Sequence, residues 1–147
     1  MLYETRLFPE REYTFKHALT HEVAYGGLLQ ERRRVLHGRI VEVLEALAVE
    51  RLAEQVDRLA HHAWQGEVWE KAVRYLRQAG AKAIAGSANR EAAAHFERAL
   101  VALRHLPESR TSMEYAIDVR CELRTALLPL NERERMFDIL REAEALA

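Results

Sequence analysis

The chain has 147 residues, of which 49% are hydrophobic and 31% charged, and its formal net charge is −1. This composition predicts a soluble, folded domain rather than a disordered or membrane chain, and so balanced a charge creates no overall field that would attract nucleic acid or an acidic membrane. Cys121 is the one cysteine, which excludes an internal disulfide, and no apolar run approaches the ~20 residues of a membrane span. We therefore expect a cytoplasmic protein without a membrane partner.

Residues 1–20 are predicted to form a short β-hairpin. Tyr3, Thr5 and Leu7 alternate with charged residues, and a second alternation follows the turn at Pro9. Period-two alternation with aromatic side chains around a proline turn is typical of paired strands. A lone hairpin is marginal in water, so we expect its apolar face to be covered, and its free edge is the expected contact of a homodimer.

Residues 21–147 are predicted to form about six antiparallel helices with short connections. The first is expected to begin at a Thr20 N-cap and to run for roughly 27 residues. A bend or a close approach of another helix is expected at Gly26 and Gly27, because each glycine in a helix costs about 1 kcal/mol relative to alanine. The later helices are bounded by breaks at 64–67, 86–89, 107 and 129, and by capping residues expected at Thr111 and Asn131.

A short pattern, Ala-x-x-x-(Leu/Phe)-x-x-Ala, occurs twice at an interval of 20 residues. Its offsets lie on one face of a helix, where the small alanines allow a neighbouring helix to come close and the larger residue fills the gap between them. The two copies consist of Ala72, Leu76 and Ala79, and of Ala92, Phe96 and Ala99. The pattern therefore predicts closely packed helices around a continuous core.

This pattern resembles the second helix of a tetratricopeptide (TPR) repeat, although regular TPR copies lie ~34 residues apart. The segments YTFKHALTHEVAY (13–25), GEVWEKA (66–72) and HLPE (105–108) also resemble part of the large bacterial AAA-type signalling ATPases, many of them fused to a class III adenylate or guanylate cyclase. The resemblance implies that residues 1–20 end a winged-helix-like module and that residues 21–147 form a TPR-like array.

The function that the resemblance implies is a non-catalytic, regulatory interaction domain of a nucleotide-dependent signalling protein. It would bind a protein partner or its own upstream ATPase or cyclase module. The sequence contains no G-x-x-x-x-G-K-[ST] phosphate loop and no recognisable cyclase segment, so we expect neither autonomous catalysis nor a cofactor. Two alternatives remain open: a fragment that assists ATPase or cyclase activity in trans, and a DNA-binding regulator that uses the hairpin and residues 32–34.

Five side chains are candidates for partner binding, each with a plainer interpretation as a packed or solvated residue. Aromatic and arginine side chains dominate many protein interfaces. The candidates are Arg32, Arg33, His62, Trp64 and Trp69. His61 precedes His62 directly, and neighbours on a helix point to different sides, so we expect no shared metal ion and no structural zinc site.

Overall fold

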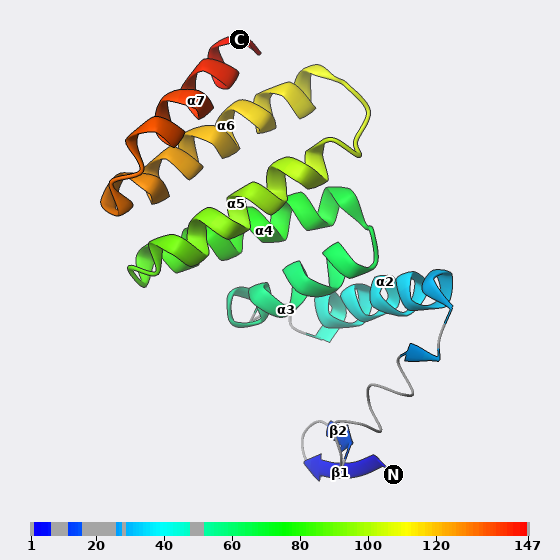
Figure 1. The fold of residues 1–147 in the computed structure, drawn as a ribbon. Coiled ribbons are helices and arrows are strands. Elements are labelled where there is room, and N and C mark those ends of the chain that lie inside the picture. Colours follow the sequence, from blue (N-terminus) through cyan, green and yellow to red (C-terminus); the bar gives the residue numbers. More distant parts are fainter. Residues whose placement is uncertain (1, 7–11, 16–25, 28, 48–51, 147) are drawn as a thin grey trace.

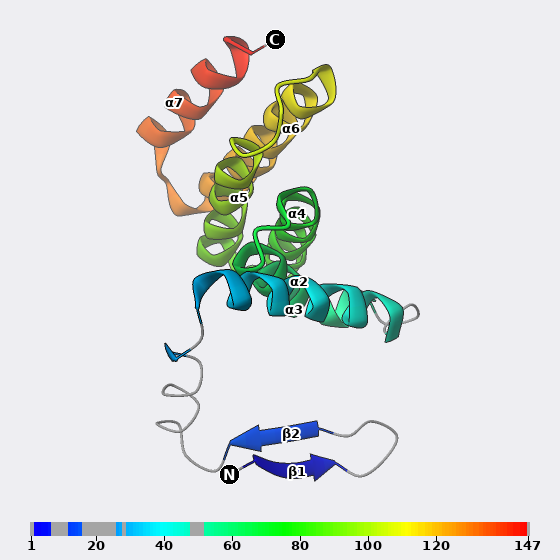
Figure 2. The ribbon, with the colours of Figure 1, turned by 90° about the vertical axis from the view of Figure 1, so that its right-hand side faces the viewer.

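The chain is mainly helical in the computed structural model, which describes residues 2–6, 12–15, 26–27, 29–47 and 52–146. Within these ranges, six α-helices follow one another and form an elongated array, with α2 and α3 at one end and α7 at the other (Figures 1 and 2). The helices are α2 (Gln30–Leu47), α3 (Leu52–Gln65), α4 (Trp69–Ala85), α5 (Asn89–Leu103), α6 (Arg110–Leu127) and α7 (Arg133–Glu144), with the 3-10 turn η1 (Leu128–Leu130) after α6. No helix in this part of the chain has the length and apolarity that crossing a membrane would need.

Two strands precede the helices, β1 (Leu2–Arg6) and β2 (Glu12–Phe15). They pair antiparallel, with Leu2 opposite Phe15, and the register is irregular between Glu4 and Arg6. The predicted turn, at 7–11, lies outside the described residues.

The predicted single helix from Thr20 to Leu47 is wrong in its continuity, because it is interrupted just before Gln30. Thr20 itself lies outside the described residues, but Gly27 lies in a turn, Leu29 belongs to no regular element, and α2 begins only at Gln30. Two adjacent glycines destabilise a helix too much for the expected bend to keep it continuous, and α2 begins only after the pair.

The turns before α4 and before α5 have the same backbone structure. Each contains a non-glycine residue with positive φ, Glu67 at 53° and Ser87 at 59°. The next residue, Val68 or Ala88, donates its N–H to a carbonyl five positions back, at 3.0 and 2.8 Å. This pattern is the Schellman motif that ends many helices. The 20-residue sequence repeat therefore corresponds to one turn and one helix, and not to a pair of helices.

The repeated residues form the centre of the core, as predicted. All six pattern positions of α4 and α5 are buried, and Phe96 has no exposed surface. Gly80 lies directly against the Phe96 ring, because a Cβ atom placed on Gly80 would come within 2.6 Å of two ring carbons. Consecutive helices pack against each other along the whole array, and α4 also contacts α6. The close approach of α4 to α5 thus depends on a glycine that faces an aromatic ring.

Two predicted N-caps are wrong. The N-cap of α6 is Ser109 and not Thr111; its hydroxyl accepts a hydrogen bond from the Ser112 N–H at 3.1 Å, and the Ser112 hydroxyl accepts one from the Ser109 N–H at 2.8 Å. Asn131 has left-handed backbone geometry, and the N-cap of α7 is Glu132, which makes no capping hydrogen bond through its side chain. Both errors arose because more than one polar residue in each connection can cap a helix, and the path of the chain selects among them.

Candidate functional site

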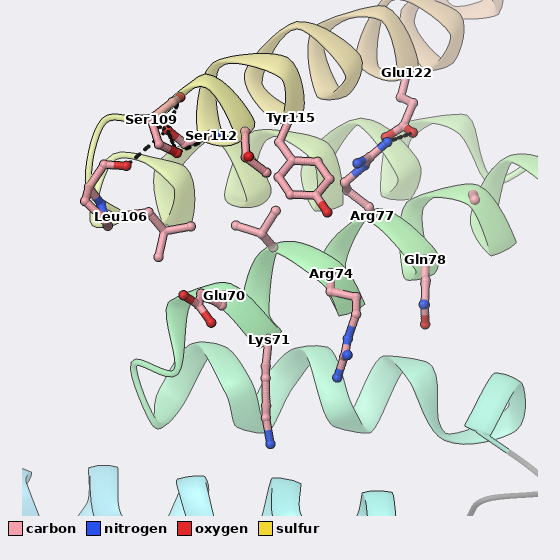
Figure 3. Close-up of a pocket in the computed structure, with 14 residues that line it drawn as sticks. Glu70, Lys71, Arg74, Arg77, Gln78, Leu106, Ser109, Ser112, Tyr115 and Glu122 are labelled. Atoms are coloured by element: carbon pink, nitrogen blue, oxygen red, sulfur yellow. Dashed lines mark hydrogen bonds and ion pairs between the residues drawn. The ribbon is translucent and has the colours of Figure 1, made fainter.

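A groove of about 740 Å³ lies between α4 and α6 and is closed at one end by the connection from α5 to α6 (Figure 3). We call it the α4–α6 groove. One face of α4 forms a wall, because residues at intervals of three and four lie on the same side of a helix. The lining residues are Glu70, Lys71, Val73, Arg74, Arg77, Gln78 and Ala81 from α4, Leu106, Pro107 and Ser109 from the connection, and Thr111, Ser112, Tyr115 and Glu122 from α6.

Arg77 connects the two walls of the groove. Its guanidinium donates to both carboxylate oxygens of Glu122, at 2.6 and 3.1 Å, and lies 3.5 Å from an oxygen of Asp118. The hydrogen bond to Glu122 raises the pKa of Arg77 above its ordinary value. The same guanidinium lies 5.3 Å from the centre of the Tyr115 ring, within cation–π range. Figure 3 shows the tyrosine beside this ion pair. Two-point contacts of this kind hold a long side chain in one orientation.

A second ion cluster links α4 to α2. Glu45 of α2 accepts hydrogen bonds from Lys71 at 2.6 Å, from Arg74 at 2.8 Å and from the Tyr75 hydroxyl. Burial alone would raise the pKa of Glu45, but the hydrogen bonds from Lys71 and Tyr75 outweigh it and lower that pKa. Burial, together with the hydrogen bond to Glu45, raises the pKa of Tyr75. Ion pairs thus join α2 to α4 and α4 to α6. Every second helix of the array, α2, α4 and α6, therefore contributes to one charged face.

The chemistry of the groove is that of a recognition surface. Val73, Ala81 and Leu106 provide an apolar part, and paired charges of both signs surround it. The three cations, Lys71, Arg74 and Arg77, are paired with Glu45 and Glu122. Glu70 in the lining supplies a third negative charge, so the groove has no excess of positive charge. Such a surface suits a segment that combines apolar contacts with a few hydrogen bonds, rather than a polyanion.

Three histidines from α2 and α3 lie together on another part of the molecule. The Nδ1 atoms of His37 and His62 are 2.8 Å apart, so one ring donates a hydrogen bond to the other, and the ring centre of His61 lies 5.1 Å from that of His62. Burial, followed by the nearby charges of His37, His61 and Arg58, lowers the pKa of His62 to about 4. Burial also lowers the pKa of His37, assisted by His61. The predicted interface residue His62 therefore faces α2, half-buried.

Acidification from pH 7 to pH 5 is expected to lower the free energy of unfolding by about 1 kcal/mol through this cluster. The unfolded chain binds protons with the ordinary histidine pKa of 6.5, whereas folded His62 binds one only near pH 4. The contribution of His62 to the free energy of unfolding is therefore fully present above pH 6.5, and it is lost as the pH drops from 6.5 toward 4. The magnitude allows for solvent screening at a partly exposed ring. Urea titrations at several pH values measure the slope.

The matched variants for this prediction are His62→Gln and His61→Gln. His62→Gln is expected to flatten the dependence between pH 6.5 and 4.5, while His61→Gln, at an exposed neighbour, keeps most of it. An equal slope in the wild type and in His62→Gln would contradict the assignment.

An aromatic cluster joins α3, α4 and the end of α5. The rings of Trp64 and Trp69 meet edge to face with centres 5.7 Å apart, Trp69 stacks on His105 at 4.0 Å, and the Arg98 guanidinium lies 4.7 Å from the centre of Trp64. Burial lowers the pKa of Arg98. Both tryptophans are partly buried, so they fix the junction of three helices and also present an edge to solvent.

Three of the five predicted interface residues lie together. Arg33, Trp64 and Trp69 line a pocket of about 470 Å³ at the junction of α2, α3 and α4. Arg33 is partly buried and donates to the Gly26 carbonyl at 3.0 Å, whereas Arg32 is exposed. The assignment of these residues to a partner stays a prediction.

The run of three arginines does not form one basic surface. The guanidinium of Arg34 pairs with Glu67 at 2.7 Å, Arg33 bonds to the backbone, and Arg32 extends into solvent. This arrangement does not favour the DNA-binding alternative, which would need several arginines free to contact phosphates. Among the described ranges, no group of three His, Cys, Asp or Glu side chains is placed to hold a metal ion.

Sequence reasoning missed the α4–α6 groove. The available signal was the outer face of α4, opposite the apolar stripe, where Lys71, Arg74 and Arg77 follow at intervals of three and Gln78 lies four residues after Arg74. Their acidic partners could not be paired with them from sequence, because Glu45 and Glu122 lie 26 and 45 residues away from Lys71 and Arg77.

Comparison of the chain with protein-family models, with curated proteins and with solved structures gives no match. Its function is therefore inferred from the geometry of the groove and from the sequence features described above.

Proposed function

We propose that this chain is a non-catalytic, TPR-like interaction domain that binds a protein segment in the α4–α6 groove. The observation that carries the proposal is the groove itself, whose two walls are joined and oriented by the Arg77–Glu122 ion pair. Preordered side chains lower the entropy cost of binding, because fewer rotamers have to be fixed on association.

The TPR-like part of the proposal is supported by the order and packing of the helices. Stacked helix pairs that contact mainly their neighbours are the basis of repeat proteins, whose shared face serves as a binding surface. Helices α2, α4 and α6 begin at Gln30, Trp69 and Arg110, so successive pairs start about 40 residues apart, which is longer than the ~34 of a regular TPR. The array that we propose is therefore an irregular one.

The resemblance of the sequence extends the proposal to a biological role. In that role, residues 21–147 are the regulatory arm of a cytoplasmic, nucleotide-dependent signalling protein, and residues 1–20 end a winged-helix-like module. The bound segment then belongs to a protein partner or to an upstream ATPase or cyclase module.

A groove-filling variant is expected to abolish binding. Ala81 lines the groove and is exposed, so Ala81→Arg adds bulk and charge there without disturbing the core. Peptides selected from a random library on the wild-type protein should lose at least tenfold in affinity for Ala81→Arg, measured by fluorescence anisotropy. Thr125→Arg, at an exposed position of α6 outside the groove lining, is the control and should bind as the wild type does. Selected peptides that bind Ala81→Arg and the wild type equally would contradict the proposal.

A further inference from the structure

Helix α2 has a second apolar face, which the described residues leave exposed. Leu36, Ile40, Val43 and Leu47 follow one another at intervals of four, three and four and are between 36% and 68% exposed. We call these residues the outer stripe. The inner side of the same helix carries the buried His37 and Val41. Intervals of four and three place the outer stripe on one side of the helix, as in a two-helix coiled coil.

Charges of opposite sign lie along one flank of the outer stripe. Arg39 and Glu42 are both exposed and lie on the same side of it, because positions three apart share a helix face. Neither residue forms an ion pair with another side chain in the part of the chain that the structure describes. They are therefore available to a partner that brings a complementary flank against α2.

A second copy of α2 provides that complementary flank when it lies antiparallel. The stripe then pairs with itself, Leu36 opposite Leu47 and Ile40 opposite Val43. Antiparallel pairing brings the same flank of both helices together, so Arg39 of each copy lies within about two residues, or ~3 Å along the axis, of the level of Glu42 of the other. Parallel pairing puts these flanks on opposite sides of the pair and leaves both charges without a partner.

We propose that the outer stripe is the contact through which two copies of this chain pair, with their α2 helices antiparallel about a twofold axis midway between Ile40 and Val43. A twofold contact uses the same patch on both copies and closes on itself. The apolar residues provide the buried area, and the Arg39 and Glu42 flank selects the antiparallel direction. This pairing leaves the α4–α6 groove free, so it is independent of the proposed binding function.

The oligomeric state of the full chain tests the pairing. Sedimentation equilibrium is expected to give twice the chain mass of 17.0 kDa at micromolar concentration. Val43→Lys should raise the dissociation constant at least 100-fold, because it places a charge in the apolar contact. Val101→Lys replaces a similarly exposed valine on α5 and should leave the dimer intact. Circular dichroism checks that both variants are folded.

Cysteine cross-linking tests the direction. In a Cys121→Ser background, a mixture of Leu36→Cys and Leu47→Cys chains should form a disulfide between the two variants, because antiparallel pairing sets these positions opposite each other. Leu47→Cys alone should not link to its own copy, because the same pairing separates the two residues by ~16 Å along the helix, beyond the ~7 Å that a disulfide spans between Cα atoms. A monomer at all concentrations would overturn the proposal, as would self-linking of Leu47→Cys, or a dimer that Phe137→Lys on α7 dissociates and Val43→Lys does not.

Discussion

Phe96→Ala is expected to lower the free energy of unfolding by about 3–5 kcal/mol, a large share of the ~5–15 kcal/mol that holds a domain of this kind together. The ring has no exposed surface and fills the space between α4 and α5 in the middle of the array. Its removal takes away apolar burial and leaves a cavity beside Gly80, which has no side chain to fill it. Urea unfolding followed by circular dichroism gives the value.

Because Gly80 contacts the Phe96 ring, the effect of Gly80→Ala on the free energy of unfolding is expected to change sign when the ring is removed. In the wild type, Gly80→Ala places a methyl group about 2.6 Å from the ring carbons of Phe96, and such overpacking costs about 1–3 kcal/mol. In the Phe96→Ala background the obstacle is gone, and the same substitution should stabilise the helix by up to about 1 kcal/mol. Equal effects of Gly80→Ala in the two backgrounds would show that the glycine and the ring are not in contact.

Gly66→Ala is expected to destabilise the junction of α2 and α3 by about 2–3 kcal/mol. A Cβ atom at Gly66 would lie 2.8 Å from the backbone nitrogen of Gly38 and 3.2 Å from the carbonyl oxygen of Arg34. These are backbone atoms of α2, so they cannot move aside as a side chain can. The helix must therefore shift away, which also strains the ion pair between Arg34 and Glu67. Hydrogen exchange should show faster exchange of the α2 amides than in the wild type.

Gly86→Ala is the matched control for both glycine predictions. Gly86 occupies the position in the next turn that Gly66 occupies in its own, but a Cβ atom there meets nothing closer than 3.6 Å. Its φ of −84° suits alanine, so the substitution should be neutral or slightly stabilising. A loss at Gly86 as large as at Gly66 would mean that the turns require glycine for another reason.

Local signals in the sequence were sufficient for the helices and the inner core. Breaks at Gly66, Gly86 and Pro129 and the apolar spacing of Ala72 to Ala79 located α3 to α7, because helix periodicity and helix stops act over a few residues. The same reasoning failed where several polar residues could each serve as the N-cap, as at the starts of α6 and α7. It also predicted one continuous helix through Gly26 and Gly27, whereas the structure has a turn at Gly27 and begins α2 at Gln30.

What the amino-acid sequence determined by itself is a chain of amphipathic helices with a repeated unit of 20 residues. What only the tertiary structure decided is which polar residues meet. Arg77 pairs with Glu122, Lys71 pairs with Glu45, and His37 and His62 share a hydrogen bond, each across an interval of 25 residues or more. The physical reason is that apolar periodicity selects the buried face of every helix, while the rotation and spacing of packed helices, set by contacts such as that of Gly80 with Phe96, place the outward side chains opposite one another.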